Sequence, residues 1–260
     1  MEGIINVTEI TDYLYCPRKV FLKRVKGLKE KPNRVMILGF LKHKIFDFLN
    51  KREPSTISGI KTNLKKEEII NLYVQEIKNI SQEIFSSNFE LAKSFDIGRE
   101  ELENQASEFL KKDILLRAQT IKKGLEKGYI GKELWENLNP KYFTEFKITS
   151  EKLKLRGRID RVLISEKIIP YEIKTREGVY DSDKIQLAAY SLLLEDKFKR
   201  EVKIGFVETN KKNHEILITK EMKARVLEIA EKIRQMKDAN FQNNFNKCRF
   251  CKFKEECFDL

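Results

Sequence analysis

Gly157-Arg158-Ile159-Asp160 and, after eleven further residues, Glu172-Ile173-Lys174 are the most informative part of this 260-residue sequence. Both motifs lie in runs that alternate polar and apolar residues, which predicts two neighbouring β-strands joined by a short turn. Glu172 and Lys174 are two residues apart and therefore point to the same face of their strand. Pairing of the strands brings Asp160, expected at the end of the preceding strand, near that face. The sequence thus predicts two carboxylates and one amine in a shared site.

Carboxylate oxygens are the ligands that Mg²⁺ or Mn²⁺ requires. A cation held there can make hydroxide from water and stabilise the charge on a phosphodiester during cleavage, while Lys174 orients the attacking water. The same pattern also occurs as a surface salt-bridge ladder between strands. Two details favour the metal site. Apolar Ile159 and Ile173 flank the charges, and Pro170 precedes Glu172, which is typical of an interrupted strand at a functional edge.

Periodicity elsewhere predicts a mixed α/β core with a helical subdomain inserted before it. The strands expected in the core are 142–149, 152–164, 167–174, 202–208 and 214–219, with helices at 181–197 and 220–239. A helix is expected at 34–51, a loop at 51–61 around Pro54, and helices through 64–138. The expected division is an N-terminal segment 1–55, a helical insertion 56–138, the core 139–240 and a cysteine-bearing segment 241–260.

Three further side chains are candidates for the site. Gln186 and Tyr190 lie one turn apart on a predicted helix and share a face. An amide and a phenol so placed suit phosphate or base contacts, although a capped core tyrosine gives the same spacing. His43 lies off the apolar stripe of its helix, and Gly39 one turn before it would let another group approach closely.

All but one of the four cysteines fall in the last thirteen residues, as Cys248-Arg-Phe-Cys251 and Cys257, and the remaining one is Cys16. If the two ends of the chain meet, these thiols form a four-cysteine site. Thiolates hold structural zinc as well as a [4Fe–4S] cluster, so both remain open. Either would fasten the terminal segments together.

The net charge is +12, from 52 Lys and Arg against 40 Asp and Glu. Such a surface favours a polyanionic partner, although a Lys- and Glu-rich composition also suits a thermophile. The sequence shows no signal-peptide pattern and no apolar run long enough to span a membrane. We therefore expect a cytoplasmic protein with reduced thiols and no membrane partner.

Taken together, the motifs resemble those of the RecB-like nucleases and, within them, the CRISPR-associated iron–sulfur exonuclease family. The matching set spans nearly the whole chain in the family's order. It comprises Cys16-Pro-Arg, Gly39-x-x-x-His43, Gly157-Arg-Ile-Asp160, Pro170-Tyr-Glu172-Ile-Lys174, Gln186-x-x-x-Tyr190 and Cys248-x-x-Cys251 with Cys257.

The resemblance implies a restriction-endonuclease-like, or PD-(D/E)XK, core. It implies catalysis by Lys174 with an accessory motif in Gln186 and Tyr190. The implied ligands of Mg²⁺ or Mn²⁺ are His43, Asp160, Glu172 and the carbonyl of Ile173, and those of a [4Fe–4S] cluster are Cys16, Cys248, Cys251 and Cys257. Family members cut single-stranded DNA or DNA ends, often 5′→3′, and trim DNA for insertion into CRISPR arrays alongside integrase proteins.

Two features depart from the family pattern. The helical stretch 60–138 is long for it, and Arg176 stands where a glycine is expected soon after Glu-x-Lys. Two alternatives therefore remain beside a metal-dependent DNA exonuclease of CRISPR spacer acquisition. One is a non-catalytic nucleic-acid-binding module with a structural metal site, and the other is a RecB-like nuclease of recombinational repair.

Overall fold

A computed structural model describes residues 3–139, 141–174, 176–209, 212–237, 245–249 and 251–258. The chain divides into two compact units, Met1–Lys31 with Phe146–Leu260, and Pro32–Glu145. We call the first the sheet unit and the second the helical unit. The helical unit contains the predicted insertion 56–138 and also the helix that carries His43.

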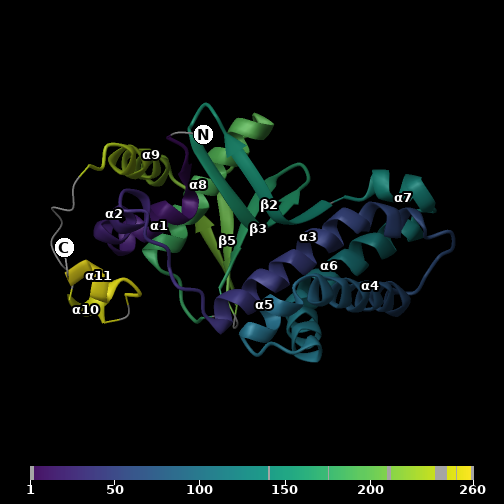
Figure 1. Ribbon diagram of the computed structural model, residues 1–260. Helices are drawn as coiled ribbons and strands as arrows, with labels where there is room; N and C mark the ends of the chain where they lie inside the picture. Colours follow the sequence, from purple (N-terminus) through teal and green to yellow (C-terminus); the bar gives the residue numbers. More distant parts are fainter. Residues whose placement is uncertain are drawn as a thin grey trace. The chain divides into compact units, whose positions relative to one another are not determined.

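A mixed sheet forms the centre of the sheet unit (Figure 1). Its described strands are β1 (Ile5–Asn6), β2 (Lys141–Ser150), β3 (Leu155–Ile164), β4 (Ile168–Ile173), β5 (Ile204–Glu208) and β6 (Asn213–Leu217). Their order is β1-β3-β4-β5-β6, and β2 also pairs with β3. β3 and β4 are antiparallel, with Arg161 opposite Tyr171, whereas β4 and β5 are parallel, with Glu172 opposite Val207. The predicted mixed-sheet α/β fold class is confirmed.

The described helices of the sheet unit are α1 (Val7–Tyr15), α2 (Pro17–Arg24), α8 (Asp181–Phe198), α9 (Lys220–Arg234), α10 (Phe245–Cys248) and α11 (Lys254–Phe258). Of these, α1, α8 and α9 contact the sheet and bury its apolar residues. α8 lies against β3, β4 and β5, and α1 and α9 pack on α8. Ile159 and Val162 of β3 enter the same core as Leu187 and Leu194 of α8. Burial of these side chains is the main force that holds α8 on the sheet.

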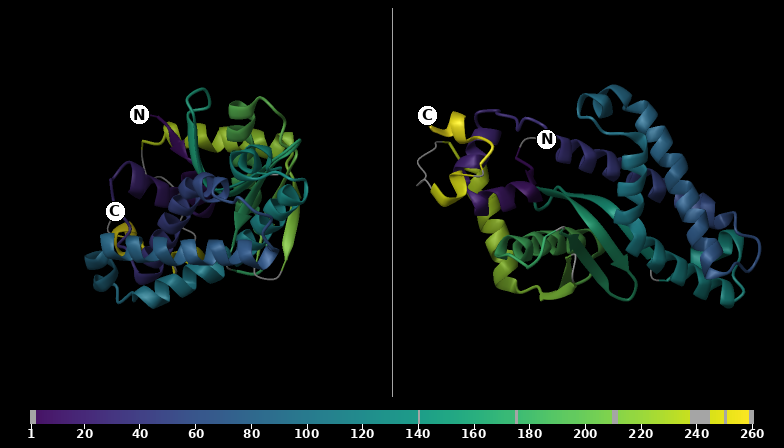
Figure 2. Two further views of the ribbon diagram at one scale, coloured as in Figure 1. Left: turned by 90° about the vertical axis from the view of Figure 1, so that its right-hand side faces the viewer. Right: turned by 90° about the horizontal axis from the view of Figure 1, so that it is seen from below.

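The helical unit consists, in its described part, of α3 (Arg34–Ser58), α4 (Lys66–Ser87), α5 (Phe89–Ser94), α6 (Arg99–Glu126) and α7 (Gly131–Asn137). α4 packs along α3 and α6, as the views in Figure 2 show. Its contact face repeats every three or four residues through Ile69, Tyr73, Ile77, Ile80 and Ile84, all of them buried.

The predicted loop at 51–61 is wrong, because α3 continues through Pro54 to Ser58. Proline removes one backbone hydrogen bond from a helix. Buried contacts on both sides of it offset that loss. Glu53 accepts a hydrogen bond from Tyr73 Oη (2.6 Å) and forms an ion pair with buried Arg117, and Ile57 is 1% exposed.

Two predicted positions near the site also need correction. Asp160 lies inside β3 rather than at its end. Pro170 does not mark an edge or an interruption, because β4 is continuous and lies between β3 and β5. The recorded pairs between β4 and β5 begin at Tyr171, after the proline, so its missing N–H does not interrupt that ladder.

Among the described residues, no helix is both long enough and apolar enough to cross a membrane.

Candidate active site

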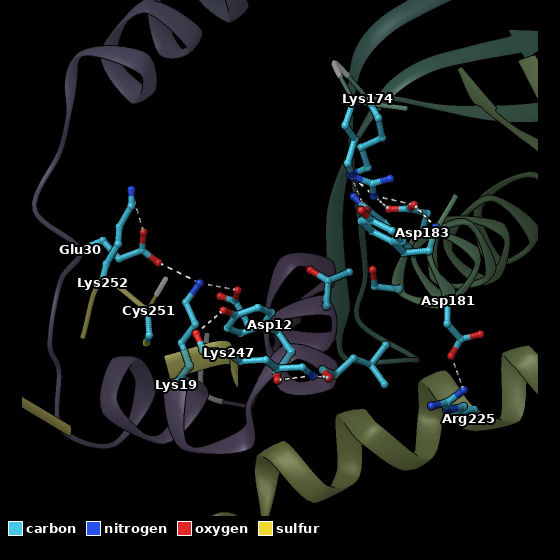
Figure 3. A pocket seen from close by; sticks show the side chains of 17 residues that line it. Asp12, Lys19, Glu30, Lys174, Asp181, Asp183, Arg225, Lys247, Cys251 and Lys252 are labelled. Atoms are coloured by element: carbon cyan, nitrogen blue, oxygen red, sulfur yellow. Dashed lines mark hydrogen bonds and ion pairs between the residues drawn. The ribbon is translucent and has the colours of Figure 1, made fainter. Parts of the chain in front are cut away.

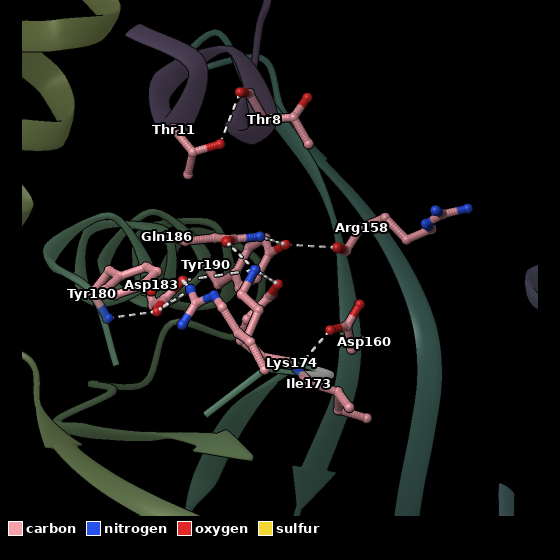
Figure 4. Close-up of polar contacts among 12 residues, drawn as sticks. Thr8, Thr11, Arg158, Asp160, Ile173, Lys174, Tyr180, Asp183, Gln186 and Tyr190 are labelled. Carbon is pink, nitrogen blue, oxygen red and sulfur yellow. Dashed lines mark hydrogen bonds and ion pairs between the residues drawn. The ribbon is translucent and has the colours of Figure 1, made fainter. Parts of the chain in front are cut away.

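β3 and β4 bring together the predicted carboxylates and amine (Figure 4). Asp160 Oδ2 accepts a hydrogen bond of 2.7 Å from the backbone N–H of Ile173. Lys174 Nζ lies 2.6 Å from Glu172 Oε1 and 3.3 Å from Gln186 Oε1. Glu172 lies near the end of β4, and Lys174 directly follows the last residue of that strand, so their two-residue spacing brings them to one face. Antiparallel pairing of β3 with β4 places Asp160 beside them.

One cavity of about 650 Å³ in the sheet unit is lined by all five residues predicted to be catalytic. These are Asp160, Glu172, Lys174, Gln186 and Tyr190. Basic side chains also line it, namely Lys147, Arg156 and Arg158. A cavity of this size and charge can admit a phosphodiester next to the carboxylates.

Glu172 is held in an unfavourable environment for a carboxylate. It is 4% exposed, and burial, followed by repulsion from Asp160, raises its pKa to about 8, although Lys174 opposes the shift. Among the described residues, no donor reaches its Oε2, and the neighbouring Tyr190 hydroxyl donates to the carbonyl of Arg158 (2.8 Å). A buried oxygen without a donor, beside a second carboxylate, fits a hard divalent cation.

Asp160 and Glu172 supply the two carboxylates for such a cation. Among the described residues, no three His, Cys, Asp or Glu side chains are arranged to hold a metal ion. Coordination of a cation by Asp160, Glu172 and the Ile173 carbonyl is therefore a proposal.

α8 supplies the remaining polar side chains of the cavity. Gln186 Nε2 donates to Tyr190 Oη (2.9 Å), as expected for residues one helical turn apart. Gly157 makes room for this tyrosine. A Cβ at that position would lie 3.1 Å from Tyr190 Cε1 and 3.0 Å from Val7 Cγ2. The glycine of the Gly-Arg-Ile-Asp motif is thus required by the close approach of α8 and α1 to β3.

The sequence did not predict a role for Asp183, the acidic residue that contacts both Arg176 and Lys174. Asp183 is 2% exposed, accepts from Arg176 Nη2 at both carboxylate oxygens (2.7 and 2.6 Å), and lies 3.7 Å from Lys174 Nζ. Arg176, which stands where a glycine was expected, therefore forms part of the ion-pair cluster around Asp183. The available signal was an acid three residues after Tyr180 at the start of a predicted helix, a capping position. The carboxylate also accepts from the Tyr180 N–H (2.8 Å).

His43, predicted as a metal ligand, belongs to the helical unit and lies on α3. Its Nδ1 is 2.6 Å from Oε1 of Glu145, whose side chain is 2% exposed. Its ring also meets Phe46 and Phe109 edge to face, with centroids 6.4 Å apart in each case. These contacts hold the imidazole within its own unit, and its ligation of a metal remains a proposal.

The cysteine-bearing ends of the chain meet in the sheet unit. Tyr15 Oη donates to the Lys247 carbonyl (2.7 Å), and Arg18 Nη2 donates to the Cys257 carbonyl (2.6 Å). Burial raises the pKa of the Cys257 thiol, and the charges of Cys16, Cys248 and Cys251 raise it further, while Arg18 lowers it. The four thiols are therefore neighbours. They are not arranged as a metal site within the described residues, so the predicted [4Fe–4S] or zinc centre also remains a proposal.

Comparison with known proteins supports this fold. The family model of the PD-(D/E)XK nuclease superfamily matches residues 5–258. A CRISPR-associated exonuclease Cas4/endonuclease Cas1 fusion of Leptospira interrogans serogroup Icterohaemorrhagiae serovar Lai (strain 56601) is 28% identical over 152 residues, 51% of this chain and 28% of that protein. A CRISPR-associated exonuclease Cas4 of Francisella tularensis subsp. novicida (strain U112) is 29% identical over 118 residues, 43% of this chain and 60% of that protein.

The alignments thus span less than two thirds of either relative. A solved structure, that of SSO0001, is 21% identical and covers 66% of this chain and 77% of its own, with a TM-score of 0.30. The resemblance to RecB-like, CRISPR-associated exonucleases is confirmed as sequence similarity. Because the family model covers nearly the whole sequence, the chain belongs to the PD-(D/E)XK nuclease superfamily.

Proposed function

We propose that the chain is a metal-dependent deoxyribonuclease that degrades single-stranded DNA from an end. The observation that carries this proposal is the placement of buried Glu172 beside Asp160, with Lys174 at hydrogen-bonding distance, in a cavity open to solvent. In a purely structural role, a buried carboxylate beside a second, half-buried one would cost stability. In a nuclease they hold the cation.

The proposed ligands of Mg²⁺ or Mn²⁺ are Asp160, Glu172, the Ile173 carbonyl and His43. When bound, the cation supplies an activated water and stabilises the charge that develops on the phosphodiester. Lys174 Nζ is held between Glu172 and Gln186, where it can orient that water for attack. The Gln186–Tyr190 hydrogen bond keeps the amide in place.

The cleavage polarity and the biological pathway that we propose rest on the names of the relatives. Both carry the name of a CRISPR-associated exonuclease, and one is fused to an endonuclease. We accordingly propose 5′→3′ trimming of DNA for spacer acquisition, with an integrase as partner. We further propose that Cys16, Cys248, Cys251 and Cys257 hold a [4Fe–4S] cluster, with structural zinc as the alternative occupant of the same thiolates.

The test is incubation with single- and double-stranded DNA labelled at either end, in Mn²⁺, Mg²⁺ or chelator. We expect cutting of single strands in either metal and none in chelator. Immediate release of very short products from 5′-labelled DNA, with a gradual ladder from 3′-labelled DNA, would support the polarity. Asp160→Asn should abolish cutting, whereas Glu228→Gln, an exposed acid on α9, should not. An unchanged cutting rate in Asp160→Asn would refute the assignment.

A further inference from the structure

A second cleft, of about 680 Å³, adjoins the active-site cavity within the sheet unit (Figure 3). The two share Thr11, Lys174 and Gln186 in their walls. The cleft therefore begins where the proposed cutting chemistry takes place. Among the described residues, six basic and four acidic side chains line it, so its wall carries a net positive charge that favours a phosphate backbone. Lys19 of α2 pairs with Asp12 and Glu30, and Lys247 of α10 donates to backbone carbonyls of α1.

Tyr180 lies in the wall of this cleft, and its side chain is 58% exposed. The guanidinium carbon of Arg176 lies over its ring, 3.9 Å from the centroid. One side of the ring is thereby backed by a cation, and much of the ring surface remains open to solvent.

We call the Tyr180 ring and the Arg176 guanidinium that lies over it the Tyr180 platform. Hydrogen bonds hold this platform in place before any ligand binds. Both oxygens of Asp183 accept from Arg176, and Arg176 Nη1 donates to the carbonyl of Gly178 (2.6 Å). The backbone N–H of Tyr180 donates to the same Asp183 carboxylate (2.8 Å; Figure 4). Because these bonds fix the arginine and the backbone of the tyrosine, stacking on the ring would cost little ordering entropy.

We propose that Tyr180, backed by Arg176, stacks with an unpaired nucleobase of the DNA strand that is cut beside Lys174. Aromatic side chains in basic grooves bind single strands in this way, because every base has a π-face. Bases in a duplex already stack on one another, so the platform favours single-stranded substrates. This inference rests on the proposed function and adds a determinant of its strand preference.

The test is binding of single-stranded DNA that carries the fluorescent base analogue 2-aminopurine at successive positions, in Ca²⁺, with cutting checked in parallel. With the wild-type protein, 2-aminopurine should show quenched fluorescence at one position near the end of the strand that is cut. Tyr180→Ala should remove the quenching and weaken binding by roughly 5- to 150-fold, the range for loss of one stacked base. Tyr180→Phe should stay within about 2-fold, because it keeps the ring. Phe89→Ala, which removes an exposed aromatic of α5 that also lies near a lysine, should have no effect.

An abasic site at the quenched position provides a second measurement that does not depend on the fold of the variant. It should weaken wild-type binding and leave Tyr180→Ala unchanged, so that the two losses do not add. Equal affinity of wild type and Tyr180→Ala for intact DNA, or fully additive losses, would overturn the stacking assignment while the nuclease remained active. Failure of the wild type to bind or cut any DNA would instead overturn the proposed function, and the stacking site with it.

Discussion

Replacing Glu172 with glutamine should stabilise the metal-free protein above pH 7 while it abolishes cutting. Glu172 is 4% exposed, and burial together with Asp160 raises its pKa from 4.5 to about 8. Below pH 4.5 the folded and unfolded states both carry the proton, so the shift has no effect on stability. Between pH 4.5 and 8 only the unfolded state releases the proton, and stability falls as the pH rises. Above pH 8 the loss is complete.

A shift from 4.5 to about 8 corresponds to about 5 kcal/mol, at about 1.36 kcal/mol per pH unit. This figure is an upper limit, because buried sites relax and admit water when a group ionises. Glutamine has nearly the same shape as the protonated carboxyl group and cannot ionise. We therefore expect similar stabilities of wild type and Glu172→Gln near pH 5, and a growing advantage for the variant toward pH 8.5.

Urea unfolding in buffer free of divalent ions measures this difference, followed by far-ultraviolet circular dichroism. Tryptophan fluorescence is less suitable, because the single tryptophan, Trp135, lies in the helical unit. Addition of Mn²⁺ should raise the unfolding midpoint of the wild type more than that of Glu172→Gln, since the cation removes the repulsion between the carboxylates.

Glu208→Gln is the matched control. Glu208 is 5% exposed on the neighbouring strand β5 and forms an ion pair with buried Arg161. Loss of one member of a buried pair costs about 3–5 kcal/mol, so this variant should be less stable than the wild type at pH 7 and above. The reasoning would be refuted if Glu172→Gln had no stability advantage at pH 8.5, or an advantage that was the same at pH 5.

Three further predictions concern the site and its supports. Lys174→Met should lower the cutting rate at least about 100-fold with little change in DNA affinity, as single-turnover kinetics would show; a larger effect on affinity than on rate would contradict its role in orienting water. Gly157→Ala should destabilise the protein by about 1–3 kcal/mol, as urea unfolding would show, because the added Cβ presses on Tyr190. It should also displace the Tyr190 ring and so change the tyrosine NMR signals. Unchanged spectra would argue against the close contact. Cys257→Ser should release the C-terminal segment to limited proteolysis and abolish any broad visible absorption of the purified protein; colourless wild-type protein with stoichiometric zinc would exclude the iron–sulfur centre.

Local periodicity was enough to predict the elements that position the site. Alternation along 167–174 placed Glu172 and Lys174 on one face, and helical spacing placed Gln186 next to Tyr190, because both relations depend only on the geometry of one strand or one helix. The long helices of 64–138 were predictable for the same reason, since an apolar stripe repeats along each of them.

Contacts between distant segments decided what the sequence could not. Helix α3 continues through Pro54 because Glu53 forms a buried ion pair with Arg117, which lies 64 residues further along the chain. The raised pKa of Glu172 depends on how completely α8 and the sheet exclude water around it, and the Tyr180 platform depends on Asp183 reaching back to Arg176. Spacing in the sequence thus determined which side chains can share a face. Burial and charge pairing, which exist only once the chain has folded, determined how those side chains are held and what protonation they favour.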